Sequence, residues 1–361
     1  MAESMSIRPR LKSFLTVFPI SDSTWGVRGG ADELWRIKLK DPKAVEALGA
    51  LIPFLDGEAT VEEIVAKLSG RGVDPRMAMQ ILQQLETSAL LENPDPAGLT
   101  AGEIERQEDQ IAFFSRFGTE GGARFQAHLK GSHVSVLGRG GFARALSRQL
   151  RDSGIGTVSA LISEGEAPAE TGAVFFLDRD AVWPQGKAPP DLLMVPQEFH
   201  DPRLLEAVDT WSKREDRPWM LLRSLDVQEG WVGPLFVPKQ TACYRSLDAR
   251  LRGNLPFYEE NQAFDRRVRQ AEHPAARQGG LRAQFELLSS VAVIEAVKYI
   301  SGIRPPHLAG RFLTYNFWTW DFEVHDVLRV PGIDALDDAS FPAIFPWKEV
   351  FDADDPAKAE R

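Results

Sequence analysis

Cysteine, long apolar runs and excess positive charge are what this 361-residue sequence has least of. Its only cysteine is Cys243, which excludes an internal disulfide framework and a multi-cysteine zinc site and favours a reducing, cytoplasmic location. No apolar stretch approaches the ~20 residues that cross a bilayer, so no membrane segment is expected. The net charge of −10 argues against a broad nucleic-acid-binding surface, because such surfaces collect Lys and Arg.

Length and composition predict two folded units. The chain exceeds the usual range of a single domain. Its 43% hydrophobic and 26% charged residues are those of a globular protein. The sequence Asn-Pro-Asp-Pro at 93–96 has the composition of a linker. We therefore expect a first module over 1–93, a linker and connecting helix over 94–130, a second module over 131–345 and a charged tail over 346–361.

Three strands followed by three helices are predicted in the first module. Strands are expected over 15–20 and 25–28, and a third over 33–40, where polar and apolar residues roughly alternate. The basic residues of the third strand share one face, as on a sheet edge that must avoid indiscriminate pairing. The helix starts are marked by Asp41 with Pro42, by Thr60 with Glu63, and by Asp74 with Pro75. The expected fold is a small α+β unit.

Two segments of this module resemble a known family. Leu-Asp-Gly at 55–57 with Thr-Val-Glu-Glu-Ile at 60–64, and the helix that ends Leu-Glu-Thr-Ser-Ala-Leu-Leu-Glu at 85–92, are similar to the PqqD-like winged-helix module of ribosomal peptide biosynthesis. In that family the leader of a precursor peptide adds as a strand to the third strand and lies against the third helix. The leader-binding residues that the resemblance implies are Leu34, Trp35, Arg36, Ile37, Lys38, Leu39, Met77, Ile81, Leu82 and Leu85. A proline at Ile37 is expected to disturb the added ladder.

Two other interpretations of these residues stay open. The apolar stripes also fit a plain hydrophobic core, and that role is favoured for Ile81 and Leu85, whereas binding is favoured for the strand residues 34–38. A DNA-binding winged helix would need base-reading and phosphate-contacting residues in its third helix. That helix offers only Arg76 and a run of glutamines.

A strand, a glycine turn and a helix open the second module. The apolar strand 133–137 leads directly into Gly-Arg-Gly-Gly-Phe-Ala at 138–143, a turn of the G-x-G-x-x-A type, and a helix is expected from about Arg144. Buried strands are also expected over 157–162 and 173–177. The order predicts a Rossmann-type α/β domain, although a bound nucleotide does not follow from the fold. The residues that would contact a nucleotide are Gly138, Gly140, Gly141 and Glu164.

Three segments resemble the ThiF-like partner proteins of YcaO cyclodehydratases. They are Gly-Pro followed by Thr-Ala-Cys within 233–247, the apolar helix 287–302 and an expected helix over 104–117. Their order and spacing, together with the PqqD-like module, cover nearly the whole chain. The resemblance implies a degenerate ThiF-like Rossmann domain attached to a leader-binding module.

Departures from the family pattern affect the expected cofactors. Members often hold zinc with two cysteine pairs, but Ser246 replaces one cysteine of the first pair, and Ile333 and Leu336 stand where the second pair is expected. We therefore predict that zinc is absent. In adenylating relatives an Asp with a downstream Arg-Gln pair follows the second strand. This sequence lacks that pattern, so its residues give no support for ATP activation.

Single residues that attract attention have plain explanations. The six histidines show no ligand spacing. The aromatic residues Tyr315, Phe317, Trp318 and Trp320 are expected to pack a terminal hairpin with Phe322 and Val324. A partner-docking surface is the alternative for this cluster.

The resemblance implies a function in natural-product biosynthesis of the bacteriocin or thiazole/oxazole-modified type. The protein would bind the leader of a ribosomally made precursor peptide and present the peptide to a YcaO-type cyclodehydratase or another modifying enzyme. Two alternatives stay open: a ThiF-like ATP-dependent enzyme that itself modifies the captured peptide, and a structural assembly protein that forms a homodimer. The sequence does not identify the precursor, the modification or the oligomeric state.

Overall fold

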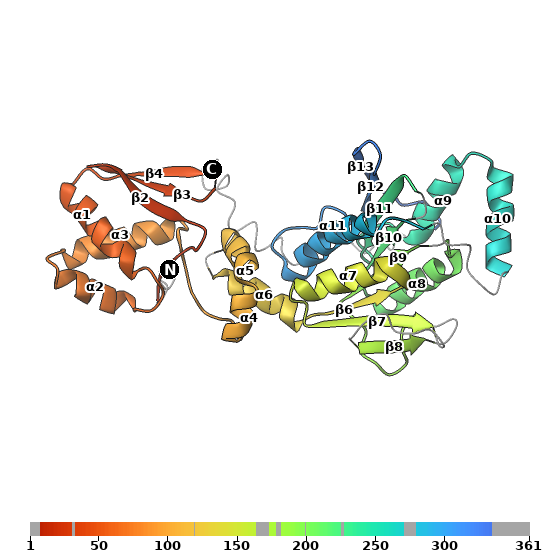
Figure 1. Cartoon of the computed structure of the whole chain (residues 1–361), viewed down its shortest axis with the longest axis horizontal. Helices are drawn as coiled ribbons and strands as arrows, with labels where there is room; N and C mark the ends of the chain where they lie inside the picture. The colour runs from red at the N-terminus through yellow and green to blue at the C-terminus, as the bar shows by residue number, and fades with distance from the viewer. Residues whose placement is uncertain are drawn as a thin grey trace. The chain divides into compact units, whose positions relative to one another are not determined.

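The chain folds into two compact units, Met1–Ala127 and His128–Arg361 (Figure 1). The computed structural model describes residues 8–30, 33–118, 120–163, 173–177, 182–198, 200–224, 227–270 and 279–333. Each unit combines a sheet with helices, so both have a mixed α/β structure. No helix within these ranges is long and apolar enough to span a membrane.

The strands of the first unit form two small antiparallel sheets. The larger sheet has the order β2 (Thr16–Ser21), β3 (Thr24–Arg28), β4 (Leu34–Lys38). The smaller sheet pairs β1 (Arg10–Leu11) with β5 (Leu91–Glu92), where Arg10 forms an ion pair with Glu92 at 2.7 Å. The third strand expected over 33–40 is therefore β4.

Three capped helices pack on the larger sheet: α1 (Pro42–Leu51), α2 (Val61–Ser69) and α3 (Pro75–Thr87), with a short 3₁₀ turn η1 (Ile52–Phe54) after α1. All three predicted caps are confirmed. The Asp41 and Asp74 side chains accept from the backbone at Lys43 and Arg76, and Thr60 with Glu63 forms a capping box. The helices and the inner face of the sheet enclose a core that includes Leu15, Val27, Leu48, Leu51, Ile64, Leu68, Ile81, Leu82 and Leu85.

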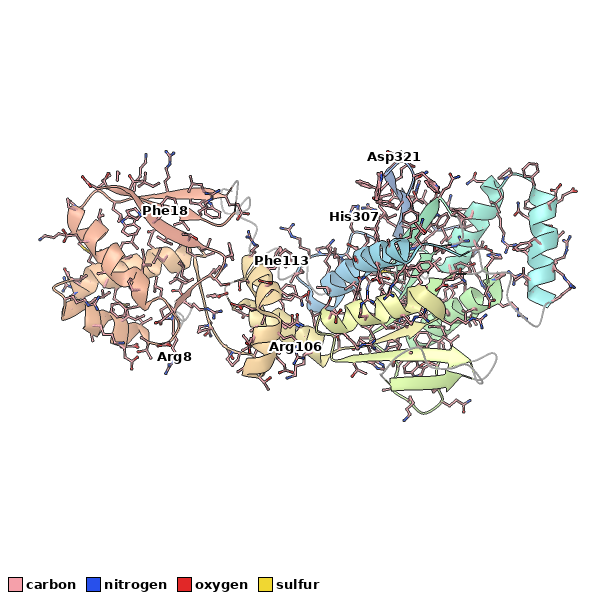
Figure 2. The ribbon with its side chains drawn as sticks, in the orientation of Figure 1. Arg8, Phe18, Arg106, Phe113, His307 and Asp321 are labelled. Atoms are coloured by element: carbon pink, nitrogen blue, oxygen red, sulfur yellow. The ribbon has the colours of Figure 1, made fainter. Side chains whose placement is uncertain are left out.

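The predicted helix over 104–117 is wrong as a single element. It is divided into α4 (Ala101–Arg106), α5 (Glu108–Phe114) and the 3₁₀ turn η2 (Ser115–Phe117), followed by α6 (Gly122–Gly131). Gln107 has non-helical dihedrals and is the N-cap of α5, whose first turn is acidic, as suits a new helix start. Figure 2 labels Arg106 at the end of α4 and Phe113 on α5. Ile104 of α4 and Ile111 of α5 pack in one cluster, which explains why apolar residues recur at helical spacing across the break.

The second unit is built on an eight-stranded sheet of order β13-β12-β11-β10-β9-β6-β7-β8. Five strands run parallel to one another: β6 (His133–Leu137), β7 (Thr157–Ser163), β8 (Ala173–Leu177), β9 (Leu192–Gln197) and β10 (Trp219–Arg223). Three antiparallel strands extend the sheet: β11 (Glu229–Phe236), β12 (Arg311–Asn316) and β13 (Phe322–Asp326). The strands expected over 133–137, 157–162 and 173–177 are therefore β6, β7 and β8, and the expected α/β domain has a sheet with a parallel core.

Helices cover both faces of this sheet. On one face α7 (Gly140–Asp152) and α11 (Arg282–Ser301) lie side by side (Figure 1), and Gln149 of α7 donates to Glu286 of α11 at 2.8 Å. On the other face α8 (Pro202–Glu215) and α9 (Tyr244–Asn254) enclose a core that includes Leu193, Val195, Leu205, Val208, Trp211, Trp219, Leu221, Phe236, Tyr244 and Leu247. The sequence predicted α7 from about Arg144, and the glycine turn instead forms its first residues.

The hairpin of β12 and β13 differs from the expected packing. Tyr315 contacts the rings of Phe317 and Trp320, as predicted for a terminal hairpin. However, Trp318, Trp320 and Phe322 are each more than 60% exposed. The expectation that the whole aromatic cluster is packed is therefore wrong for Trp318 and Phe322, and Trp320 contacts Tyr315 but stays largely exposed.

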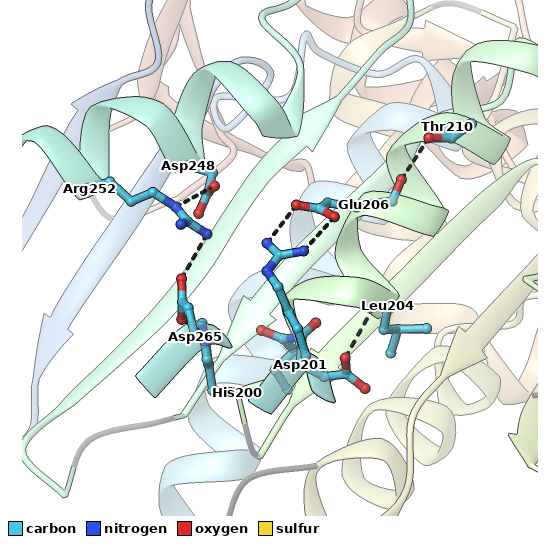
Figure 3. Close-up of polar contacts among 10 residues, drawn as sticks. His200, Asp201, Leu204, Glu206, Thr210, Asp248, Arg252 and Asp265 are labelled. Carbon is cyan, nitrogen blue, oxygen red and sulfur yellow. Dashed lines mark hydrogen bonds and ion pairs between the residues drawn. The ribbon is translucent and has the colours of Figure 1, made fainter. Parts of the chain in front are cut away.

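Ion pairs fix the exposed helix α10 (Tyr258–Gln270) to α8 and α9 (Figure 3). Arg269 of α10 binds both carboxylate oxygens of Glu206 on α8, at 2.8 and 2.7 Å. Arg252 of α9 bridges Asp248 of its own helix and Asp265 of α10, and Asp265 also contacts His200. Val268 is the only buried apolar residue of α10, so these ion pairs are the main contacts that hold α10 against α8 and α9.

Acid is expected to loosen α10. The hydrogen bonds from Arg269 hold the pKa of Glu206 below its ordinary value of 4.5, with burial acting in the opposite direction. A lowered carboxyl pKa contributes stability above the unfolded value, and that contribution is lost as pH falls through the folded value. The stability difference between the parent and Arg269→Gln should therefore be present at about pH 6 and shrink below pH 4.5.

Thermal melting of both proteins across this pH range provides the measurement. Arg266→Gln is the matched control, because Arg266 lies on the same helix and contacts only the side chain of Gln262, at 3.5 Å, among the hydrogen bonds within the described ranges. It should match the parent at every pH. A difference between parent and Arg269→Gln that stays constant down to about pH 3 would contradict the assigned role of the Glu206 carboxylate.

Candidate functional site

The first candidate site is the open edge of the three-stranded sheet in the first unit. β4 pairs with β3 on one side, and no other strand within the described residues pairs with its other side. Such an edge presents a row of backbone groups that another chain can pair with. The position of β4 agrees with the strand that the sequence assigned to peptide binding.

The register shows which backbone groups of β4 point outward. Gly29 N donates to Glu33 O at 3.0 Å, and Leu39 N donates to Ser23 O at 2.9 Å. Because hydrogen-bonded and non-hydrogen-bonded pairs alternate in an antiparallel ladder, Trp35 and Ile37 also bond to β3. The N–H and C=O groups of Leu34, Arg36 and Lys38 therefore face away from the sheet.

The side chains of β4 alternate between two faces. Trp35, Ile37 and Leu39 lie on the side of the helices, because Trp35 pairs with the buried Val27 and Ile37 pairs with Trp25. Ile37 and Leu39 pack against the core, but Trp35 is 47% exposed even though it lies on the inner side. Leu34, Arg36 and Lys38 lie on the outer face, where all three are exposed. An apolar ring is thus available at the edge beside unpaired backbone groups.

The predicted residues of α3 occupy a different environment. Ile81, Leu82 and Leu85 are buried in the core, and Met77 is half-buried against it. The exposed large apolar side chain of this helix is Met79, at 40% exposure. Sequence reasoning missed Met79 because it lies off the main apolar stripe. A contact between α3 and a bound peptide stays a prediction.

The opposite edge of the same sheet is less suited to pairing. β2 contains Pro19, which has no N–H to donate, and its pairing with β3 shifts register between Pro19 and Ser21. Irregular pairing and proline are common protections of a sheet edge. β4 has neither feature. The sheet therefore has one protected edge and one open edge.

Arg116 of η2 stabilises the turn that leads into β4. Its guanidinium donates to the carbonyl oxygen of Gly29 at 2.8 Å and to the carboxylate of Glu33 at 2.9 Å. It also lies 4.2 Å from the centroid of the Phe14 ring. These contacts fix both ends of the β3–β4 turn. No sequence signal distinguished Arg116 from other basic residues.

The second candidate site is the glycine turn between β6 and α7. Gly138 lies so close to β9 that a Cβ atom there would be 2.9 Å from the carbonyl oxygen of Pro196, and Gly140 has a φ of +87°. These positions require glycine for the path of the chain itself. Glu164, the expected ribose-binding acid, lies outside the described residues.

The backbone donors of this turn are partly occupied by the protein's own side chains. The carboxylate of Glu198, which is only 3% exposed, accepts a hydrogen bond from the backbone N–H of Phe142 at 2.8 Å, in the first turn of α7. In nucleotide-binding Rossmann domains a phosphate occupies such a position. A phosphate here would have to displace a buried negative charge.

An aromatic ring covers the same turn. Phe285 of α11 stacks on Phe142 with ring centroids 5.3 Å apart, and a Cβ atom at Gly141 would be 3.2 Å from its ring. The arrangement of Glu198 and Phe285 does not fit a nucleotide phosphate. Glu198 could have been identified from the sequence, because it directly follows the buried strand β9 at its carboxyl end.

The residues where the family would hold zinc do not fit that metal. Cys243 is buried at the N-cap of α9, and the buried Ser246 accepts a hydrogen bond from Val330 N at 3.0 Å. Ile333 is a hydrocarbon side chain, and Leu336 lies outside the described residues. Within the described part of the chain no group of three or more His, Cys, Asp or Glu could hold a metal ion. The absence of zinc stays a prediction.

Comparisons with known proteins identify the fold. No protein-family model matches the sequence, and no curated protein matches it. Solved structures match over 90% of the chain. The chain has the fold of part of the heterocyclase TruD and of nearly the whole of MccB. Its superposition on TruD has a TM-score of 0.63 at 24% sequence identity, and that on Escherichia coli MccB with MccA-N7isoASN has 0.58 at 14%.

The two kinds of relative differ in length. The chain covers 42% of TruD and 38% of a heterocyclase solved with substrate and cofactor, to which it is 21% identical with a TM-score of 0.63. It covers 98% of the MccB chain. MccB has also been solved with ATP, and in that structure the TM-score to this chain is 0.57 at 13% identity. At these identities the likeness establishes the fold alone.

Proposed function

We propose that this chain captures the leader of a ribosomally synthesised precursor peptide and presents the peptide to a separate modifying enzyme of the YcaO cyclodehydratase type. In this proposal residues 1–93 are a PqqD-like winged-helix module, 94–130 connect it, and 131–345 are a degenerate ThiF-like Rossmann domain with a tail over 346–361. Holding the leader raises the effective concentration of the rest of the peptide at the active site of the partner.

The open edge of β4 carries the proposal. Its outward backbone groups at Leu34, Arg36 and Lys38 can pair with an extended peptide, which supplies affinity that is independent of sequence. Trp35 can then bury its exposed ring against the peptide, and large aromatic rings contribute strongly to such interfaces. The hydrogen bonds from Arg116 to Gly29 and Glu33 hold the start of β4 in place before a peptide binds.

The fold relatives support a role in peptide modification. MccB was solved with MccA, and a heterocyclase was solved with its substrate and a cofactor. The chain covers 42% of TruD, so most of that heterocyclase has no counterpart in this sequence. In the proposal, a separate enzyme supplies the reaction.

The ATP-dependent enzyme is the less supported alternative, because Glu198 and Phe285 occupy the turn where a phosphate would bind. ATP hydrolysis that depends on precursor peptide and needs no partner would favour it over the proposal. An assembly protein is the other alternative, and measurement of particle mass with and without a YcaO-type protein distinguishes it.

Trp35→Ala tests the proposal directly. Titration of the full chain with a fluorescently labelled leader, taken from a short precursor gene in the same neighbourhood, should show saturable binding. The variant should bind about 10- to 30-fold more weakly, because a central aromatic residue of an interface contributes about 2 kcal/mol. Trp318→Ala is the control, since Trp318 is an exposed tryptophan of the second unit. Unchanged binding by a folded Trp35→Ala protein would argue against capture at this edge.

A further inference from the structure

The outer face of the three-stranded sheet carries charge of one sign. Cross-strand partners share a face, so the pairing of Gly26 with Arg36 and of Phe18 with Gly26 places one residue of each strand in a row. The ring of Phe18, labelled in Figure 2, lies over Gly26, where a Cβ atom would be 2.6 Å from it. The strand residues of this face are Thr16, Phe18, Thr24, Gly26, Arg28, Leu34, Arg36 and Lys38. All of its charged strand residues are basic, in a chain whose net charge is −10.

Two of these charges have no partner within the described residues. Arg36 and Lys38 are exposed, and neither forms a hydrogen bond or an ion pair with another described residue. Arg28 differs, because its Nε donates to the carbonyl oxygen of Gly30 at 3.1 Å. The unpaired charges are therefore those of the open strand, at the two positions whose backbone groups also point outward.

The register relates these charges to an added strand. A strand that pairs with Arg36 and Lys38 places every second side chain on the outer face, directly opposite or diagonal to them. Its other side chains point to the inner face, beside the exposed ring of Trp35. Parallel and antiparallel addition both give this alternation, since side chains of any strand alternate in direction.

We infer that the segment captured at β4 alternates in character, with acidic side chains two residues apart opposite Arg36 and Lys38 and apolar side chains between them beside Trp35. The inference rests on the proposed capture of an extended peptide and adds what that peptide must contain. Opposite charges in cross-strand positions stabilise a pair of strands, and like charges destabilise it. The face thus selects acidic segments and rejects basic ones, which a backbone ladder alone does not do.

Three short synthetic peptides provide the test. Each is blocked at both ends and has the same apolar residues at alternate positions, with Glu, Gln or Lys at the positions between them. Fluorescence anisotropy with the full chain should give the order Glu, then Gln, then Lys from tightest to weakest. Two cross-strand charge pairs are expected to separate the Glu and Gln peptides by roughly 2- to 30-fold, and added salt should reduce the difference.

Charge reversal on the strand should invert this order. In the double variant Arg36→Glu with Lys38→Glu the Lys peptide should bind most tightly and the Glu peptide least. Lys67→Glu is the matched control, because Lys67 lies on α2, which packs against α1 and α3 and is not part of the sheet. It reverses one charge where the double variant reverses two, and it should leave the order of the three peptides unchanged.

The outcomes separate this inference from the proposed function. Equal binding of the three peptides overturns the charge selection, and so does an order that the double reversal does not change. In either case strand capture stands if Arg36→Pro, which removes the outward-pointing N–H, weakens peptide binding. Failure of all three peptides to bind overturns the inference, and failure of the labelled leader to bind as well overturns both. Inversion of the order by the double variant but not by Lys67→Glu supports the inference.

Discussion

Replacing Arg36 by proline is expected to weaken peptide capture by about 10- to 100-fold while the first unit stays folded. The N–H of Arg36 points away from β3, so its removal costs no hydrogen bond inside the protein. Proline is tolerated on an edge strand when its missing N–H faces outward. The added peptide, however, loses a backbone bond and keeps an unsatisfied carbonyl, which together cost about 1.4 to 2.8 kcal/mol.

Two further substitutions at this strand make the result specific. Arg36→Ala keeps the N–H and removes only the charge, so it should weaken binding less than Arg36→Pro. Ile37→Pro removes an N–H that bonds to β3 and should lower the melting temperature, because the internal ladder loses a bond. The expectation that proline at Ile37 disturbs the ladder to an added peptide is therefore wrong. The backbone N–H of Ile37 points toward β3, so its loss weakens the ladder inside the protein.

Anisotropy titration and circular-dichroism melting of the three variants provide the measurements. Arg36→Pro that melts like the parent and binds the leader as tightly as the parent would exclude the β4 edge as the site. If Arg36→Ala lost as much binding as Arg36→Pro, the effect would come from the side chain and not from the backbone, which would argue against backbone pairing at this edge.

Local patterns were sufficient to predict the elements that build this edge. Alternation of polar and apolar residues predicted β4, and capping residues predicted the starts of α1, α2 and α3. Alternation reveals which face a side chain occupies. It does not reveal whether the backbone at Arg36 or at Ile37 points outward, because that depends on the pairing with β3.

Long-range contacts explain what the sequence did not predict. The period of apolar residues ran through 104–117, yet the helix breaks at Gln107 because a new N-terminus forms there. The glycine turn was predicted, but its occupation depends on Glu198 and Phe285, which lie far along the chain from it. The motif therefore predicted that a glycine turn joins β6 to α7, but it did not predict where the helix begins or what occupies the turn.

The glycine turn leads to the second large expected effect. Magnesium with ATP, or AMP, should not raise the melting temperature of the parent protein. A ligand that binds only the folded state at 100 times its dissociation constant would add about 2.7 kcal/mol of stability, so a saturating nucleotide would be visible. We expect no such rise in melting temperature because the turn is already occupied. The Glu198 carboxylate accepts from the Phe142 amide, and the Phe285 ring lies over Gly141.

Phe285→Ala measures how much this closed arrangement contributes to stability. The ring is 7% exposed and stacks on Phe142, so truncation should destabilise the second unit by about 3 to 5 kcal/mol through the cavity it leaves. For a unit of this size the melting temperature should fall by about 6 to 20 °C. Phe113→Ala on α5 is the control, because that ring is about half exposed in the first unit and its loss should have a much smaller effect.

Glu198→Gln completes the test, because it keeps the shape of the side chain and removes its charge. If the carboxylate is what excludes phosphate, this variant, and not the parent, should gain stability on addition of ATP. If neither protein responds, the Phe285 ring is sufficient to keep the turn closed, and the combination with Phe285→Ala should then be examined. A clear rise in the melting temperature of the parent with ATP would show that Glu198 and Phe285 move aside, and the ATP-dependent enzyme would then become the better supported function.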